Sequence, residues 1–271
     1  MVPQLSLTKV TSSYWRYTFD HPPLNLIDGD TLRELSATVD ELESNDALKV
    51  VVFDSAHPDY FFARYDLTAS RTAPSGPVLP GFATTLGFLP RLTRAPVISI
   101  AAIRGRTRGG GSEFALACDL RFASREKAIF GQPEVPSGIL PGAGAVERLP
   151  LLAGRSRALE IIVSGDDYDA ATAEQYGWIT RSLPDAELDS FVDRFARRIA
   201  SFDKAVLARA KHLVNRRTLP PDDDSIETQG NIEELAKSPA MVERLARARA
   251  RAKEVGAAEF ELRLGHHLGQ I

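Results

Sequence analysis

A glycine run that ends in a glutamate, Gly109-Gly110-Gly111-Ser112-Glu113, is the first segment whose residue types could support catalysis. Glycine lets a ligand approach the main chain closely, and the first turn of a helix offers unpaired N–H groups. Such groups could hold an oxyanion, and Glu113, about one turn beyond Gly110, could move a proton on a carbon next to a carbonyl. Alternatively, the glycines only permit close packing, and Glu113 interacts with the helix dipole. This segment alone does not decide between the two.

A second carboxylate, Glu134, stands in an apolar segment at 130–144 that is dense in proline and glycine. A lone carboxylate in such a loop is more often solvent-exposed than catalytic. The many prolines and glycines nevertheless indicate a main-chain path with fixed turns and unusual dihedral angles. Glu134 is therefore a candidate partner for Glu113.

The segments around these residues alternate between strand and helix patterns. The first is a hairpin or a pair of short strands at residues 5–19. Further strands are predicted at 50–53, 97–103 and 120–123, and helices at 30–44, 83–92 and from the glycine run onward. This order is typical of α/β proteins with parallel sheets and right-handed crossovers. Residues 71–81, which are rich in proline, glycine and serine, are predicted to form a mobile loop.

The last third of the chain reads differently, because it carries helix patterns at 186–215 and 225–255 with few strand signals. We therefore place a boundary near residues 195–200. A basic helical run at 244–251 is interpreted as a solvated helix face in preference to a phosphate contact.

Composition excludes several classes of protein. The chain has 271 residues, 44% of them hydrophobic and 25% charged, as in globular domains. A net charge of −3 lacks the excess of basic residues that is typical of nucleic-acid-binding proteins. The single cysteine, Cys118, excludes an internal disulfide framework, and the five histidines show no metal-ligand spacing. No apolar run approaches the roughly 20 residues of a membrane span, and no secretory signal is evident, so a cytoplasmic protein is expected.

Taken together, these motifs resemble the enoyl-CoA hydratase/isomerase (crotonase) family. The resemblance rests on the glycine run with Glu113 and on the segment with Glu134, 21 residues further on. Motifs elsewhere agree in type and order: His21-Pro22-Pro23-Leu24-Asn25, Pro96-Val97-Ile98, Arg148-Leu149-Pro150, Gly154, Gly165, Gly177 and Pro184. The similarity covers about residues 20–185 and is weak in the C-terminal third.

The resemblance implies an α/β fold, a crotonase-like spiral of ββα units with a helical C-terminal region. We expect residues 1–197 to form the ββα core with an acyl-CoA site, and residues 198–271 to form a helical oligomerisation region. A homotrimer or a dimer of trimers is expected. Coenzyme A belongs to the acyl-CoA substrate, so the resemblance implies no separate cofactor and no metal, and no nucleic acid or membrane partner is expected.

The resemblance also assigns roles to residues of the site. The main-chain amides of Tyr65 and Gly110 would hold the thioester oxygen, with Ala63 in the same substrate-binding segment. Glu113 and Glu134 would be the acid/base pair, in an order that the sequence leaves open. Two further residues are expected at the site: Gln132, to orient Glu134 or the water, and Gly142, whose amide could contact the water.

Hydration of a 2-enoyl-CoA thioester is the activity that the pair of glutamates favours. Three other reactions through the same enolate remain open, namely isomerisation, thioester hydrolysis and C–C cleavage. The chain could also be a catalytically silent protein that only binds CoA thioesters.

Several residues depart from the family pattern. Arg64 and Tyr65 stand where the family usually has small residues, and either could contact the substrate or point away from it. We favour the second. Arg104, Arg106 and Arg108 could reach CoA phosphates or an acidic substrate, or could pair with acids at a subunit interface. The sequence does not choose between these.

Overall fold

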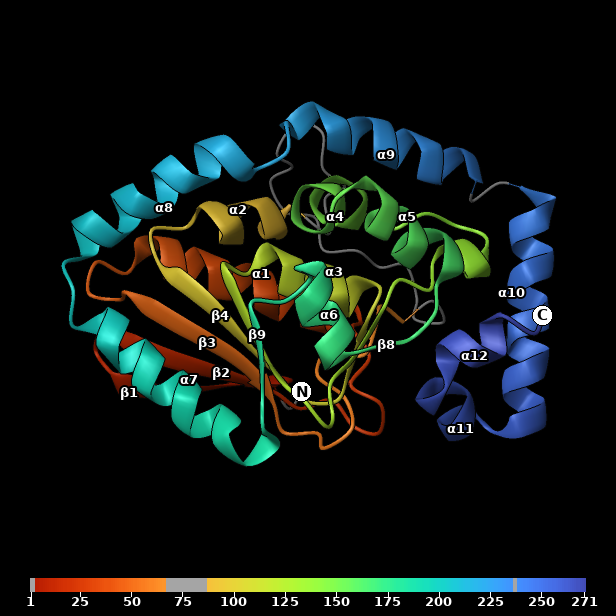
Figure 1. Cartoon of the computed structure of the whole chain (residues 1–271), viewed down its shortest axis with the longest axis horizontal. Helices are drawn as coiled ribbons and strands as arrows, with labels where there is room; N and C mark the ends of the chain where they lie inside the picture. Colours follow the sequence, from red (N-terminus) through yellow and green to blue (C-terminus); the bar gives the residue numbers. More distant parts are fainter. Residues whose placement is uncertain (1–2, 67–86, 236–237) are drawn as a thin grey trace.

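The computed structural model describes residues 3–66, 87–235 and 238–271 (Figure 1). The loop predicted at 71–81 and the first residues of the helix predicted at 83–92 lie outside the described residues. Among the described residues, no helix combines the length and the apolar character needed to cross a membrane.

A six-stranded sheet forms the body of the fold, in the order β1-β2-β3-β4-β6-β9. Its strands are β1 (Leu5–Thr11), β2 (Tyr14–Phe19), β3 (Val50–Ser55), β4 (Ile98–Ile103), β6 (Leu120–Ser124) and β9 (Arg181–Leu183). The β1–β2 hairpin is antiparallel, as residues 5–19 predicted, and every later pair is parallel. The predicted α/β arrangement is therefore present.

The two faces of this sheet bury different helices because side chains alternate along each strand. On β3, Val50 and Val52 face one cluster together with α7 (Asp185–Ala200). Val51 and Phe53 face the larger cluster on the other side. Among the helices that contribute to it are α1 (Gly29–Ser44), α2 (Phe88–Arg94) and α3 (Gly110–Ala117), and Figure 1 shows α1 and α7 on opposite sides of the sheet.

The segments with the two glutamates follow strands of a second, three-stranded sheet. Its order is β5 (Arg106–Arg108), β7 (Ile129–Gly131) and β8 (Tyr168–Asp169), with β5 and β7 parallel. The chain leaves β5 into the glycine run and α3, and it leaves β7 towards Glu134 and a short 3₁₀ helix, η1 (Val135–Ser137). Since neighbouring parallel strands end at the same edge, both glutamates are brought to one side of the sheet.

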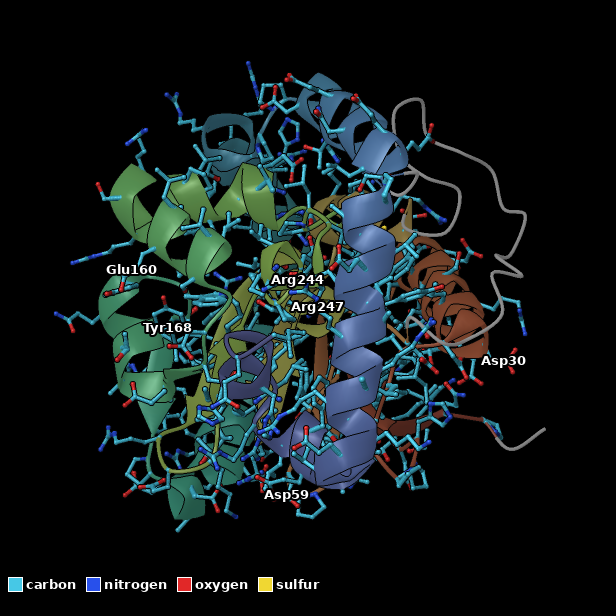
Figure 2. The ribbon with its side chains drawn as sticks, turned by 90° about the vertical axis from the view of Figure 1, so that its right-hand side faces the viewer. Asp30, Asp59, Glu160, Tyr168, Arg244 and Arg247 are labelled. Atoms are coloured by element: carbon cyan, nitrogen blue, oxygen red, sulfur yellow. The ribbon has the colours of Figure 1, made fainter. Side chains whose placement is uncertain are left out.

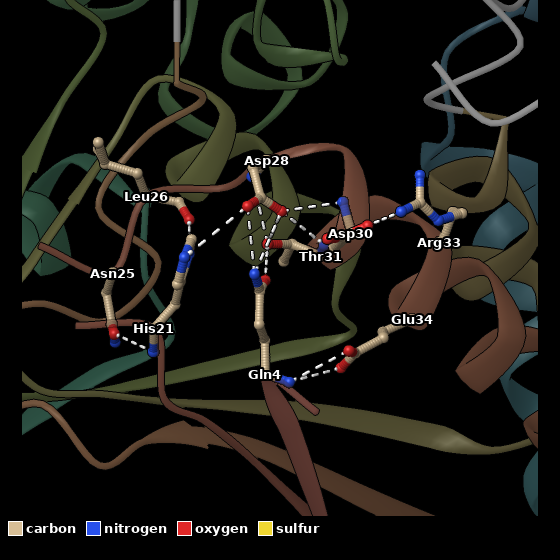
Figure 3. Close-up of polar contacts among 9 residues, drawn as sticks. All are labelled: Gln4, His21, Asn25, Leu26, Asp28, Asp30, Thr31, Arg33 and Glu34. Carbon is tan, nitrogen blue, oxygen red and sulfur yellow. Dashed lines mark hydrogen bonds and ion pairs between the residues drawn. The ribbon is translucent and has the colours of Figure 1, made fainter. Parts of the chain in front are cut away.

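The loop at residues 21–28 is fixed by the start of α1 (Figure 3). Asp28 caps this helix by accepting hydrogen bonds from the amides of Asp30 and Thr31, at 2.9 Å each. Gln4 donates to Asp28, and the Gln4 amide donates to Glu34, which ties β1 to the same helix end. This network matters for the site because residues 25–27 pair with residues 63–66.

Helices make up the rest of the chain. After the glutamate segments come α4 (Ala145–Ala153), α5 (Arg155–Ser164) and α6 (Ala170–Tyr176). The C-terminal part contains α8 (Lys204–Thr218), α9 (Asp222–Leu235), α10 (Pro239–Val255), α11 (Ala257–Leu262) and α12 (Leu264–Leu268). The region predicted as helical at 186–215 is thus divided, since Asp203 caps a new helix. The division of the chain at residue 197 stays a prediction.

The last three helices fold back onto the core. Figure 2 shows α10 in front of the molecule, with Arg244 and Arg247 labelled on it. Arg244 donates hydrogen bonds from Nε to the carbonyl of Pro136 (2.6 Å) and from Nη1 to the carbonyl of Ile271 (2.5 Å). One arginine of the basic run therefore joins η1 to the end of the chain.

Candidate active site

Two glycines of the run, Gly109 and Gly111, are required by close contacts around the start of α3. A Cβ on Gly111 would lie 1.8 Å from the carbonyl oxygen of Phe62. Gly109 has a positive φ of 47°, and a Cβ there would lie 2.3 Å from Oε1 of Glu134. These glycines therefore let the helix start approach two other segments of the site at once.

Two main-chain amides meet next to this helix start. Ile27 donates to the carbonyl of Arg64 and accepts from the amide of Asp66, both at 2.8 Å. Because the carbonyl and N–H of a trans peptide point in opposite directions, the amide of Tyr65 is directed away from Ile27. It lies 3.5 Å from where a Cβ of Gly110 would stand. The Gly110 amide belongs to the first turn of α3, whose N–H groups lack partners within the helix. Such an arrangement of donors can hold an oxyanion.

Glu113 is buried, with 3% of its surface exposed, and is held by main-chain amides. Its Oε1 accepts hydrogen bonds from the amides of Ala143 (2.7 Å) and Ala145 (3.1 Å). Burial raises the pKa of Glu113 to about 7, although these two amides oppose the rise. The carboxyl group can therefore gain or lose a proton near neutral pH.

Glu134 directly precedes η1 and is partly buried. Burial and the negative charge of Glu113 raise the pKa of Glu134 well above its ordinary value, and the charge of Arg64 opposes the rise. Gln132, fully buried beside it, donates from Nε2 to Oε2 of Glu134 at 3.4 Å. The two glutamates interact electrostatically, so they titrate as a pair.

Both carboxyl groups border one cavity of about 890 Å³. Tyr65, Gly110 and Gly142 line it as well, so the structure brings together five of the seven residues predicted for the site. Its other walls are mainly apolar and come from α1, α2, the loop after η1 and the C-terminal helices, for example Leu35, Phe88, Ile139, Leu245, Phe260 and Leu264. An apolar cleft with a few convergent polar groups is the usual form of a small-molecule site.

The two remaining predicted residues, Ala63 and Gln132, are buried and are not among the residues that line the cavity. The Ala63 amide donates to the carbonyl of Asn25 at 2.9 Å, and the Ala63 carbonyl accepts from the amide of Arg108 at 2.8 Å. Ala63 thus supports the Tyr65 segment from behind, while Gln132 supports Glu134.

Three of the four arginines that depart from the family pattern, Arg64, Arg104 and Arg108, form ion pairs within the chain. Arg64 forms an ion pair with Glu261 of α11, at 2.8 Å between Nη2 and Oε2. Arg104 pairs with Asp185 and Asp189 of α7. For Arg104, acidic partners were considered at a subunit interface, and the structure instead provides them within the same chain.

The other two arginines lie close to α11. Arg108, which is buried, pairs with Asp167 at 2.6 Å and donates to the carbonyl of Glu261 at 2.9 Å. Arg106 donates to the carbonyl of Leu262 at 2.8 Å.

Sequence patterns missed two polar residues near the cavity, Glu261 and Gln229. Gln229 of α9 donates from Nε2 to the carbonyl of Gly142 at 2.6 Å. Both residues come from the C-terminal third, where the family resemblance is weak. The apolar spacing of Phe260, Leu264 and Leu268, four residues apart, could have indicated a buried helical face there. Across 3–66, 87–235 and 238–271, no group of His, Cys, Asp or Glu side chains could hold a metal ion.

Comparisons with known proteins identify the family to which this chain is similar. The family model described as enoyl-CoA hydratase/isomerase matches residues 11–250. A relative from Bacillus subtilis (strain 168), "Putative enoyl-CoA hydratase/isomerase YngF", is 32% identical over 192 residues, which are 71% of this chain and 74% of the relative. A Dictyostelium discoideum relative, "Probable enoyl-CoA hydratase, mitochondrial", is 40% identical over 122 residues, which are 45% of this chain and 43% of the relative. The match with that protein thus spans less than half of its length.

A solved structure extends the match to the whole fold. A "putative enoyl-CoA hydratase from Streptomyces avermitilis" is 39% identical and superposes with a TM-score of 0.90, covering 99% of this chain and 97% of the other. The chain belongs to the enoyl-CoA hydratase/isomerase family. The crotonase-like α/β fold predicted from the sequence is confirmed.

Proposed function

We propose that the protein adds water to a 2-enoyl-CoA thioester through an enolate held by main-chain amides. One observation carries the proposal. Glu113 and Glu134, both with raised pKa, line the same cavity as Gly110 and Tyr65, whose main-chain amides are the oxyanion donors. A hydratase needs one carboxylate and one carboxylic acid at the same time. Two coupled carboxyl groups that share one proton supply that state.

The surroundings of the two glutamates suggest their roles. Glu113 accepts two amide hydrogen bonds, which favour its ionised form. Its charge in turn favours the protonated form of Glu134. We therefore assign Glu113 as the base that takes a proton from water as the oxygen bonds to the β-carbon. Glu134 is the acid that gives its proton to the α-carbon, and exchange with solvent restores both groups.

The two amides complete the mechanism. Negative charge that develops on the thioester oxygen would be stabilised by the N–H groups of Tyr65 and Gly110. Loss of one such donor typically raises a barrier by about 3 kcal/mol. Coenzyme A enters as part of the substrate, so the proposal requires no separate cofactor and no metal.

The proposal includes a trimer-based assembly and a cytoplasmic location. Val206, Leu213 and Val214 form a stripe on α8 with 64%, 57% and 59% of their surfaces exposed. Exposed apolar stripes of this kind are typical of subunit contacts. The one cysteine, Cys118, is a buried free thiol, which is compatible with a reducing compartment.

Crotonyl-CoA absorbance tests the proposal, because hydration removes the conjugated enoyl chromophore. We expect the wild type to consume the signal. Glu113→Gln and Glu134→Gln should each lower the rate by roughly a hundredfold or more while binding of the thioester is largely retained. Glu160→Gln, on an exposed glutamate of α5, is the matched control and should keep the wild-type rate.

The outcomes separate the alternatives. A product with a shifted double bond, free CoA, or C–C cleavage would each identify another reaction of the same enolate in place of hydration. Binding without any reaction would indicate a silent CoA-thioester binder. Near-wild-type turnover of either glutamate variant would remove that residue from the mechanism.

A further inference from the structure

Arg64 connects the Tyr65 segment to the C-terminal helices. Its Nε lies 3.0 Å from each carboxylate oxygen of Glu261, and its Nη2 lies 2.8 Å from Oε2. From the same guanidinium, Nη1 donates to the carbonyl of Tyr65 at 3.0 Å. One planar group thus binds both a carboxylate of α11 and the main chain at the oxyanion donor.

Glu261 has few other ways to satisfy its charge, since its side chain is only 2% exposed. Removing one partner of a buried ion pair leaves the other charge without compensation. Without Arg64, this carboxylate would have to move towards solvent, which disturbs the position of α11.

The position of α11 depends on such contacts, because a helix of six residues is not stable by itself. Its last carbonyls lack partners within the helix and are bound by Arg108 and Arg106. Three guanidinium groups of the core therefore hold one short helix. Phe260 and Glu261 of this helix line the same cavity as Tyr65.

The Tyr65 segment is held from two sides. On one side it pairs with residues 25–27 through the main chain. On the other side, the Arg64 guanidinium binds the Tyr65 carbonyl. If the guanidinium loses Glu261 it is free to rotate, and the peptide groups on both sides of the Tyr65 Cα gain freedom.

We propose that Arg64 is a positioning residue: through its ion pair with Glu261 it makes the alignment of the Tyr65 oxyanion donor depend on the docking of α11. This inference rests on the proposed function, because it assigns Tyr65 as a donor to the thioester oxygen. It gives the large arginine a role where the family usually has a small residue.

Three variants and a control test the proposal. Arg64→Gln and Glu261→Gln each break the ion pair, and the double variant leaves two neutral side chains in its place. Each single variant should lower kcat for crotonyl-CoA by about tenfold to a hundredfold, because misalignment costs less than loss of a donor. The double variant should be no slower than the slower single one. Arg104→Gln breaks ion pairs with α7 away from the cavity and should keep the wild-type kcat.

A spectroscopic measurement separates positioning from simple packing. The carbonyl of bound, ¹³C-labelled butyryl-CoA should absorb at a lower infrared frequency than in water, because main-chain N–H groups polarise it. This displacement should be smaller in both single variants than in the wild type and in Arg104→Gln. Amides of residues 257–268 should also exchange hydrogen faster in the single variants. Arg64→Lys, which keeps the charge, should restore part of the displacement.

The measurements judge the two proposals separately. If the wild type does not hydrate crotonyl-CoA, the proposed function fails, and the infrared displacement and hydrogen exchange still test Arg64. If the displacement and kcat of both single variants equal those of the wild type, or if their losses multiply in the double variant, the positioning role is overturned. Should Arg64→Gln fail to fold, the isosteric Glu261→Gln, Arg64→Lys and the double variant give the same comparison.

Discussion

At the scale of single residues, the site depends on how two carboxyl groups share a desolvated space. Burial raises the pKa of both glutamates, but their other interactions differ. Glu113 is bound by two amides, whereas Glu134 feels the charge of Glu113. Their protonation states are therefore driven apart, and a general acid and a general base can coexist near neutral pH.

The hydration rate should consequently show a bell-shaped dependence on pH. Below about 7, Glu113 becomes protonated and the rate falls, because the base is lost. At higher pH, Glu134 loses its proton and the rate falls again. In Glu113→Gln the alkaline fall should move to lower pH, since the charge that raises the pKa of Glu134 is gone. Steady-state rates across the pH range check this, and a flat profile for the wild type would contradict it.

At the scale of elements, the start of α3 is the least replaceable part of the site. Its glycines bring a helix start against the Phe62 carbonyl on one side and Glu134 on the other. The neighbouring positions Gly110 and Gly111 differ sharply in the space available. A Cβ on Gly110 would have its nearest neighbours at 3.5 Å, an ordinary contact, whereas one on Gly111 would meet a carbonyl oxygen at 1.8 Å.

We therefore expect Gly111→Ala to destabilise the protein by about 3 kcal/mol or more, because a main-chain carbonyl must move. Gly110→Ala should fold with nearly the wild-type stability, although its methyl group would lie 3.5 Å from the amide nitrogen of Tyr65 and should slow turnover. Denaturant unfolding of the two variants measures the difference. Equal free energies of unfolding would show that the Phe62 carbonyl can move without loss of stability.

Another element, α9, reaches Glu113 indirectly. Gln229 donates to the Gly142 carbonyl, and the same peptide group donates through the Ala143 amide to Glu113. Gln229→Met removes the donor and keeps a side chain of similar length. Turnover should fall about fivefold, the equivalent of about 1 kcal/mol for one hydrogen bond. Gln175→Met, on an exposed residue of α6, is the control, and an equal rate in both would rule out the effect.

At the scale of the whole molecule, one cavity joins the ββα core to the C-terminal helices. Residues before 150 supply the carboxyl groups and the amides, while α9 to α12 supply a wall and several positioning contacts. The region predicted as an oligomerisation segment therefore also contributes to the site. The exposed apolar stripe on α8 remains available for contacts with other subunits.

Light scattering should give a mass equal to three or six chains of 29.6 kDa. The physical reason is that burying the α8 stripe in a subunit contact removes apolar surface from water. A monomer at micromolar concentration would contradict the predicted assembly.

The sequence by itself determined the features that neighbouring residues encode. Strand and helix periodicity predicted most of the main sheet, and the glycine run and the proline- and glycine-rich segment made Glu113 and Glu134 candidates. The amides of Tyr65 and Gly110 followed from the family resemblance. Such features are local, because side-chain alternation and turn chemistry depend on adjacent residues.

Only the tertiary structure decided which distant residues meet. Arg64 and Glu261 are 197 positions apart, and Gln229 and Gly142 are 87 apart. With 33 basic and 36 acidic side chains in the chain, charge alone is compatible with far too many pairings to select one. Partners are chosen by how the helices pack, and packing depends on the shape of the whole core, which no single segment specifies.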